Sequence, residues 1–164
     1  SVARFVDGRP SEVFLDVPAL GQRIMALRGR VVMRNEQALT TATRQHANSA
    51  CVSLCSRSIR VLQRKPNQPF PGKIRLFGVA SLNLVSVAMG QTIAALEATP
   101  KIWDLAAAWL VLDELGCPIR WLDIDPAELS PGQDLSQTSF PMLAAGSWSE
   151  LARLLPWGEA LVQP

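Results

Sequence analysis

The residues that most constrain how this chain can fold form the run from Lys101 to Gly116, which we predict to be a single helix. Thr99 and Pro100 supply a capping hydroxyl and a proline at the first helical position, with Asp104 as an alternative cap. Gly116 ends the helix, and Pro118 prevents its continuation. One stripe of the helix is formed by Leu105, Ala108, Trp109, Leu112 and Leu115, and Ala107, Leu110 and Val111 cover much of the rest. A helix that is apolar nearly all round is buried on more than one face, so this chain must fold in layers.

Asp104 is the exception in this apolar run. A carboxylate in the first turn is stabilised by the helix dipole, and a buried carboxylate needs a hydrogen-bond donor, a cation or a metal. Two interpretations are open from composition alone: a carboxylate at a helix start without chemistry, or a ligand in a site.

The sequence around Asp104 resembles the second signature of the inositol monophosphatase family. That signature reads Trp-Asp-x-Ala-Ala, a hydrophobic run, then Glu-Ala-Gly-Gly; here Trp103-Asp104 precede Ala106-Ala107, and Glu114-Leu-Gly116 close the helix. The upstream run from Arg75 to Gly90 resembles the family's preceding segment, and the spacing between the two also fits. Together these stretches cover about a quarter of the chain.

The resemblance implies a fold, an activity and a site. The fold is α+β, the later portion of a layered α/β/α/β/α sandwich. The activity is Mg²⁺-dependent hydrolysis of a phosphate monoester, an inositol phosphate or a sugar phosphate, in which the metal activates a water. The resemblance makes Asp104 a catalytic metal ligand, brings Glu97 to a substrate hydroxyl, and places the backbone of Gly78, Val79 and Ala80 beside the substrate at a helix start, where N–H groups suit an anion. Without the resemblance, Glu97 reads as a solvated strand end and Gly78 as a simple strand-to-helix turn.

The chain also departs from the family pattern. The family's first signature, Asp-Pro-x-Asp-Gly-Thr, and an upstream glutamate supply most metal ligands, and neither is found; Asp125-Pro126 and Asp7-Gly8 are not this motif. Ile93 stands where the family usually has Asp, and Cys117 where it has a second Gly. One carboxylate cannot hold Mg²⁺ ions that need several oxygen ligands. We therefore expect this chain alone to be inactive, as part of a longer phosphatase that is a homodimer when complete; the alternative is a non-catalytic binding or interaction protein derived from the phosphatase fold.

Composition excludes several other classes of protein. The length of 164 residues, with 48% apolar and 18% charged residues, indicates one globular domain. A net charge of +2 gives no reason to expect nucleic-acid binding, and no apolar run reaches membrane-spanning length. We expect a cytoplasmic protein with a small phosphorylated substrate.

The only histidine, His46, is expected at the surface, and the three cysteines are expected to be reduced because Cys51 and Cys55 would lie about 13 Å apart on a strand.

The remaining pattern divides this single partial domain in two. Residues 1–64 read as a meander of strands with a hairpin turn at Asp7-Gly8, a polar stretch at 35–48, and a short helix capped by Ser56 or Ser58. Its basic residues Arg57, Arg60, Arg64 and Lys65 form a solvated face or, less favoured, a phosphate contact. Residues 65–72 are a linker. Residues 73–164 alternate strand and helix: the helix 79–89 carries Asn83 and Ser86 on one side, and a last helix opens with the capping box Ser147–Glu150 and ends before Pro156.

Overall fold

The computed structural model of the chain describes residues 1–41, 50–126, 130 and 132–163. Its first half forms an antiparallel sheet, here called the N-terminal sheet, in the order β1-β2-β3-β4-β5. Its strands are β1 (Val2–Val6), β2 (Arg9–Val17), β3 (Gln22–Leu27), β4 (Val32–Arg34) and β5 (Gln37–Leu39), with the short 3-10 helix η1 (Pro18–Leu20) between β2 and β3. The predicted hairpin is confirmed: Val6 pairs with Arg9, and Asp7 and Gly8 both adopt positive φ.

The second half forms a mixed sheet, here called the C-terminal sheet, in the order β7-β6-β8-β10-β9. Its strands are β6 (Cys51–Leu54), β7 (Lys73–Arg75), β8 (Ala94–Glu97), β9 (Ile119–Trp121) and β10 (Met142–Ala145). β6 runs parallel to β7 and β8, whereas β10 runs antiparallel to β8 and β9. The carboxyl ends of β6, β7 and β8 therefore meet at one edge.

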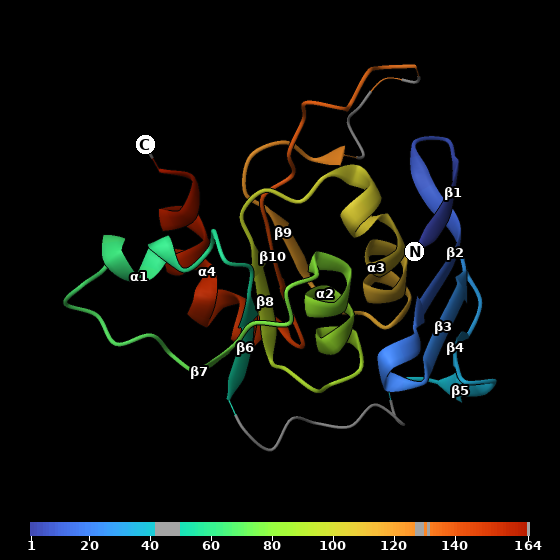
Figure 1. Cartoon of the computed structure of the whole chain (residues 1–164), viewed down its shortest axis with the longest axis horizontal. Helices are drawn as coiled ribbons and strands as arrows, with labels where there is room; N and C mark the ends of the chain where they lie inside the picture. Colours follow the sequence, from blue (N-terminus) through green and yellow to red (C-terminus); the bar gives the residue numbers. More distant parts are fainter. Residues whose placement is uncertain (42–49, 127–129, 131, 164) are drawn as a thin grey trace.

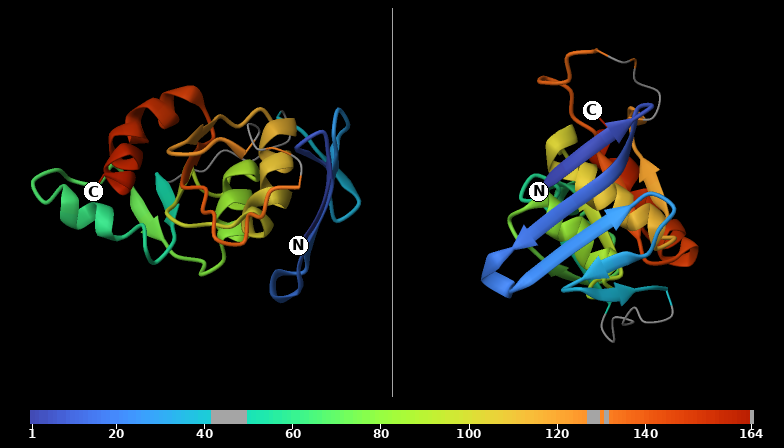
Figure 2. Two further views of the ribbon diagram at one scale, coloured as in Figure 1. Left: turned by 90° about the horizontal axis from the view of Figure 1, so that it is seen from above. Right: turned by 90° about the vertical axis from the view of Figure 1, so that its right-hand side faces the viewer.

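Four helices in the described part of the chain complete the layers. α2 (Ala80–Ala88) and α3 (Ile102–Glu114) lie between the two sheets, and α1 (Arg60–Arg64) and α4 (Trp148–Val162) cover the other face of the C-terminal sheet. Figures 1 and 2 show this β/α/β/α succession across the molecule. The α+β class is confirmed, and the described residues supply four layers of the expected sandwich. α3 packs on β1, β2 and β3 with one side and on α2 with another, as its all-round apolar surface predicts.

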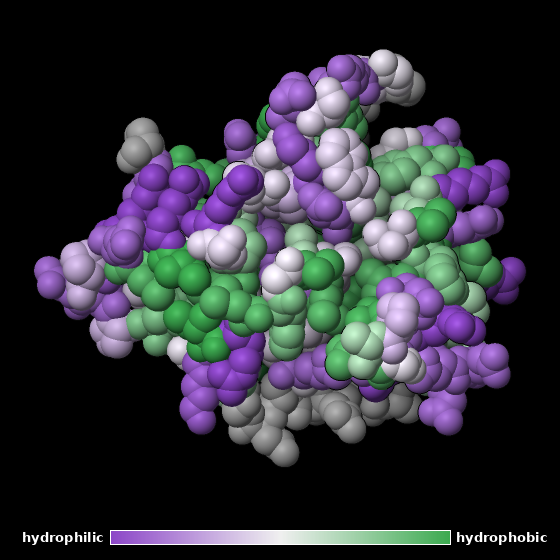
Figure 3. All heavy atoms as spheres, viewed as in Figure 1, coloured by the Kyte–Doolittle hydropathy of each residue, from purple (hydrophilic) through white to green (hydrophobic). Residues whose placement is uncertain are grey.

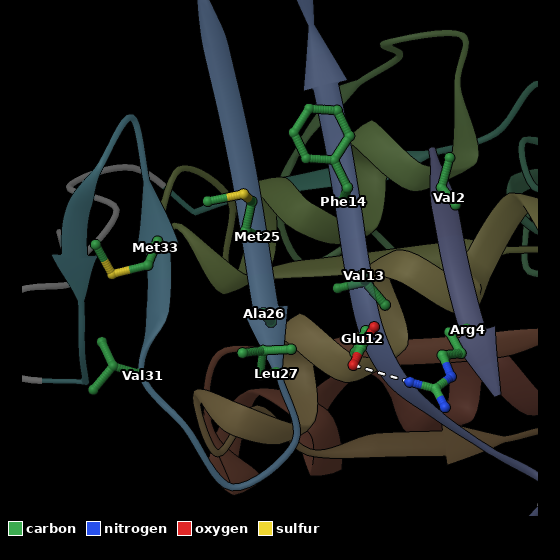
Figure 4. Close-up of a pocket in the computed structure, with 10 residues that line it drawn as sticks. All are labelled: Val2, Arg4, Glu12, Val13, Phe14, Met25, Ala26, Leu27, Val31 and Met33. Carbon is green, nitrogen blue, oxygen red and sulfur yellow. Dashed lines mark hydrogen bonds and ion pairs between the residues drawn. The ribbon is translucent and has the colours of Figure 1, made fainter. Parts of the chain in front are cut away.

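The outer face of the N-terminal sheet is exposed. β2 alternates between buried Val13 and Leu15, which face the helices, and exposed Phe14, which points away. In the right-hand view of Figure 2 this face turns toward the viewer with no described helix over it. Figure 4 shows the cavity of about 400 Å³ on this face, where apolar side chains stand beside the ion pair of Arg4 and Glu12. A sheet face this apolar is typical of a packing surface.

The structure corrects two sequence-based expectations about α4 and α1. α4 continues through Pro156 to Val162, because its second half buries Trp157 and Leu161 in the core and this packing outweighs the hydrogen bond that proline lacks. Neither Ser56 nor Ser58 caps α1: the Ser58 hydroxyl donates to the Leu96 carbonyl at 2.7 Å.

Arg57, Arg60 and Arg64 are all exposed, as expected for a solvated face, and each also makes a specific contact. Arg57 donates to the Thr99 hydroxyl at 2.7 Å, whereas Arg60 and Arg64 donate to carbonyls at the end of α4. The polar stretch 35–48 contains β5, and its residues 42–48, including His46, lie outside the described residues.

Two further expectations, on the cysteines and on the start of α4, hold. The three cysteines, all within the described part of the chain, form no disulfide. The hydroxyl of Ser147 accepts the N–H of Glu150, as predicted for the start of α4. None of the described helices has the length and apolar character required to cross a membrane.

Candidate functional site

The carboxyl ends of β6, β7 and β8 enclose a cavity of about 560 Å³ together with the first turns of α2 and α3. Its wall is formed by Cys55, Ser56, Arg57, Leu76, Phe77, Gly78, Val79, Ala80, Glu97, Thr99, Pro100 and Asp104. All five residues named from the sequence as candidate site residues are therefore in one place. In Figure 3 apolar residues reach the surface between α1 and α2, on the side of the molecule where the segment after β7 runs.

The Gly78 turn forms one wall of this cavity. Gly78 has a φ of +77°, a conformation that glycine adopts without strain, and it links β7 to α2. α2 begins with Val79 in an extended conformation and has no side-chain cap. The exposed N–H groups of its first turn therefore border the cavity, where they can receive an anion.

Asp104 lies in the first turn of α3 at the opposite wall. It is not the cap of the helix, which is Lys101; its Oδ2 accepts the Lys101 backbone N–H at 2.9 Å. This bond holds the side chain in place at the start of the helix. Its side chain is half-buried, so it reaches the cavity without being sealed from solvent.

Glu97 ends β8 and is only 2% exposed. Its Oε1 accepts a hydrogen bond from the Asn83 side-chain amide at 2.6 Å. Burial raises the pKa of Glu97 to about 7, while the bonds from Asn83 and the Cys55 thiol lower it and the charge of Asp104 raises it. The carboxyl group is therefore partly protonated and partly ionised at neutral pH.

A chain of buried polar groups, here called the polar seam, runs from Glu97 between α2 and the C-terminal sheet. It consists of Ser53, Asn83, Ser86, Thr92 and Glu97, all nearly inaccessible to solvent. Ser86 and Thr92 hydroxyls lie 2.7 Å apart, and Ser86 and Ser53 each donate to the Asn83 carbonyl, at 2.6 and 3.0 Å. The seam satisfies polar groups that burial would otherwise destabilise.

Sequence reasoning missed several residues of the cavity. Arg57 brings a cation to the wall, and the sequence grouped it with three other basic residues because only the fold separates them. The side chains of Leu76 and Phe77 line the cavity although they are half exposed or nearly so. The pairing of Asn83 and Ser86 on one side of α2 was visible in the sequence, and it is the signal that could have revealed the polar seam.

Among the described residues, no three His, Cys, Asp or Glu side chains are grouped closely enough to hold a metal ion. Two carboxyl groups line the cavity, the half-buried Asp104 and the more buried Glu97. Mg²⁺ takes six oxygen ligands, several of them waters, and Asp104 is one of them at most. The donor set of these residues by itself therefore does not fit a Mg²⁺ pair.

Comparison with known proteins agrees with this geometry. The model of the inositol monophosphatase family matches residues 1–154. Nus factor SuhB of Xylella fastidiosa is 31% identical over 123 residues, which are 71% of this chain and 45% of that protein. This chain thus spans about half the length of that relative.

Solved structures show the same fold. A staphylococcal inositol monophosphatase-1 in a LiCl-soaked complex superposes with a TM-score of 0.70 at 21% identity, over 98% of this chain and 56% of that one. An IMPase/NADP phosphatase complexed with Mg²⁺ and phosphate gives 0.69 at 21% identity, over 99% and 58%. The match of the family model over nearly the whole sequence, together with these likenesses, shows that the chain belongs to the inositol monophosphatase family.

Proposed function

We propose that this chain supplies the substrate-binding part of a Mg²⁺-dependent phosphate monoester hydrolase that acts on a small inositol phosphate or sugar phosphate. The observation that carries the proposal is the convergence of the Gly78 turn, Glu97 and Asp104 on one cavity. A similar structure that holds Mg²⁺ and phosphate supports the divalent metal.

Each group has a task that its chemistry permits. The N–H groups at the start of α2 bind the phosphate, since a helix start favours negative charge. Glu97 in its charged form accepts a hydrogen bond from a substrate hydroxyl and so orients the ester. Asp104 would offer one oxygen ligand to a divalent metal, and such a metal, when bound, would supply charge stabilisation to the phosphate.

The remaining metal ligands must come from outside these residues. We therefore propose that the chain acts as part of a longer protein and that alone it does not hydrolyse phosphate esters. The exposed outer face of the N-terminal sheet supports this, because a further layer packed there would cover its apolar side chains.

A second function is favoured by a separate observation. Since the described residues hold no metal cluster, and the relative SuhB is named a Nus factor, the chain is alternatively a non-catalytic binding protein. In that case the cavity takes a ligand without cleaving it, or the exposed sheet face binds another protein.

Binding of inositol 1-phosphate in the presence of Mg²⁺, followed by amide NMR shifts, tests the proposal. We expect shifts at Gly78–Ala80 and Glu97, weakened by Asp104→Asn, with no phosphate release by this chain. Asp113→Asn, at the far end of α3, is the matched control. Shifts confined to other regions would contradict the proposed site, and metal-dependent turnover that survives repurification would contradict the need for further ligands.

A version of the protein that contains the missing ligands gives a sharper test. There Asp104→Asn should keep the helix, which is held by Leu105 and Trp109, and lower Mg²⁺-dependent turnover about a hundredfold or more. Near-normal turnover would show that Asp104 is a carboxylate at a helix start with no role in catalysis.

A further inference from the structure

We propose that Asn83 is a positioning residue that holds Glu97 and the turn at Phe77 and Gly78 in fixed register on two walls of the cavity. The proposal rests on the proposed function, since it assumes that the cavity receives a hydroxyl-bearing phosphate ester. Asn83 itself is fully buried and is not among the residues that line the cavity.

The hydrogen bonds of the Asn83 amide fix its orientation. Nδ2 donates to Glu97 Oε1 at 2.6 Å and to the Leu54 carbonyl at 3.4 Å, while Oδ1 accepts the Phe77 backbone N–H at 3.3 Å. If the amide were turned by 180°, its NH₂ group would face the Phe77 N–H and its oxygen would face the Glu97 carboxylate. Only one orientation is therefore consistent with these partners.

These three partners lie on three different elements that end at the cavity. Leu54 is the last residue of β6, Glu97 the last of β8, and Phe77 belongs to the segment between β7 and α2. One side chain therefore links the ends of two strands to the turn that presents the α2 N–H groups. Loss of this link would change the distance between the group expected to hold the phosphate and the group expected to hold the hydroxyl.

Two other residues of the polar seam bond to Asn83 only through its backbone. Ser86 and Ser53 both donate to its backbone carbonyl, and neither lines the cavity. Ser86 is therefore a matched control: it lies on the same helix, is equally buried, and contacts Asn83 without contacting Glu97.

Asn83 also sets the charge of Glu97. An N–H donor stabilises the carboxylate form, which is the form that accepts a hydroxyl. Cys55 and Asp104 also face this carboxyl group, from the segment after β6 and from α3. Asn83→Ala removes a donor and leaves these other groups in place, so the pKa of Glu97 should rise and less carboxylate should remain at neutral pH.

The first experiment needs no ligand. Carboxyl NMR of Glu97 and hydrogen exchange of the Phe77 amide are compared in the unaltered chain, Asn83→Ala, Asn83→Leu and Ser86→Ala. We expect both Asn83 variants to titrate Glu97 at higher pH and to exchange the Phe77 amide at least tenfold faster, with Ser86→Ala unchanged. Two Asn83 substitutions are used so that a folding defect in one leaves the other informative. Unchanged exchange of the Phe77 amide in a folded Asn83 variant would overturn the proposal.

The second experiment is a double-mutant cycle on binding of inositol 1-phosphate with Mg²⁺, measured by calorimetry. Asn83→Ala should weaken binding tenfold or more, and should weaken it little further once Glu97→Gln is present. Additive losses would show that Asn83 does not act through Glu97 and would overturn the proposal. If the unaltered chain binds no inositol 1-phosphate, the proposed function fails, and the ligand-free experiment alone decides the role of Asn83.

Discussion

The two sheets of this molecule differ in how many of their faces are covered. β6, β8 and β10 are buried at every position, because helices lie on both faces of the C-terminal sheet. β2 and β3 alternate between buried and exposed residues, because the described helices cover only one face of the N-terminal sheet. The covered sheet holds the polar seam and the candidate site, and the half-covered sheet presents an apolar cavity.

This difference indicates what each of the two cavities is suited to bind. The cavity at the C-terminal sheet gathers a carboxylate, a buried acid, an arginine and a helix start around one volume. The cavity on the N-terminal sheet is formed mainly by apolar side chains that happen to share a face (Figure 4). The first arrangement is typical of a ligand site and the second of a packing surface.

The largest expected effect compares one apolar residue from each sheet. Leu143, fully buried in β10, should lose about 2–5 kcal/mol of unfolding free energy on substitution by alanine. Met25, 43% exposed in β3, should lose no more than about 0.5 kcal/mol. Urea unfolding of both variants measures this. Equal losses would show that the outer face of the N-terminal sheet is covered in solution.

The pH dependence of stability is the next largest effect. Because burial raises the pKa of Glu97 from 4.5 to about 7, the folded state binds the proton more tightly than the unfolded state. The resulting stabilisation is complete below pH 4.5 and falls by roughly 3 kcal/mol as pH rises through 7. Unfolding of Glu97→Gln over the same range should lack this decline. Parallel pH profiles for the two proteins would contradict the buried state of Glu97.

Association should reveal the uncovered face. Phe14 and Leu27 stand on the outer face of the N-terminal sheet, exposed by 37% and 51%. We expect the chain to self-associate and to bind a hydrophobic dye, and Phe14→Lys with Leu27→Lys to reduce both without destabilising the fold. Light scattering and dye fluorescence provide the measurement. A monomer that binds no dye before substitution would contradict this expectation.

The smallest effect is expected at Asp113, on the end of α3 that faces the N-terminal sheet. Burial raises its pKa to about 6, and the charges of Arg9 and Arg28 oppose this. Its side chain is nevertheless exposed by surface area, so solvent screens the effect. Asp113→Asn should change the free energy of unfolding at pH 7 by no more than about 0.5 kcal/mol. Thermal unfolding measures this, and a larger change would contradict the expectation.

Much of the fold follows from local sequence. The apolar helix at Asp104 is buried on two sides as its pattern predicts, and the alternation of β2 and β3 shows which face is inward. The end of α4 was not predictable, because burial of Trp157 and two arginines from α1 decide whether the helix passes Pro156.

The site was predictable only in its motif residues. Gly78, Glu97 and Asp104 are named by the family resemblance, and the fold brings them to one cavity. Arg57 carries no local signal of its role, and the pairing of Asn83 with Ser86 on α2 indicates a polar side of that helix without indicating which residues it contacts. The contacts that Arg57 and Asn83 make with Thr99 and Glu97 join segments that are brought together only when β6, α2 and β8 align.

The position of β10 has a consequence for the order of folding. β10 lies between β8 and β9 although both precede it in the sequence. On a ribosome, β8 and β9 emerge with a vacant place between them that only residues 142–145 can fill. The C-terminal sheet, and with it the support of the cavity, should therefore be completed late in synthesis, a non-local closure that favours slow folding.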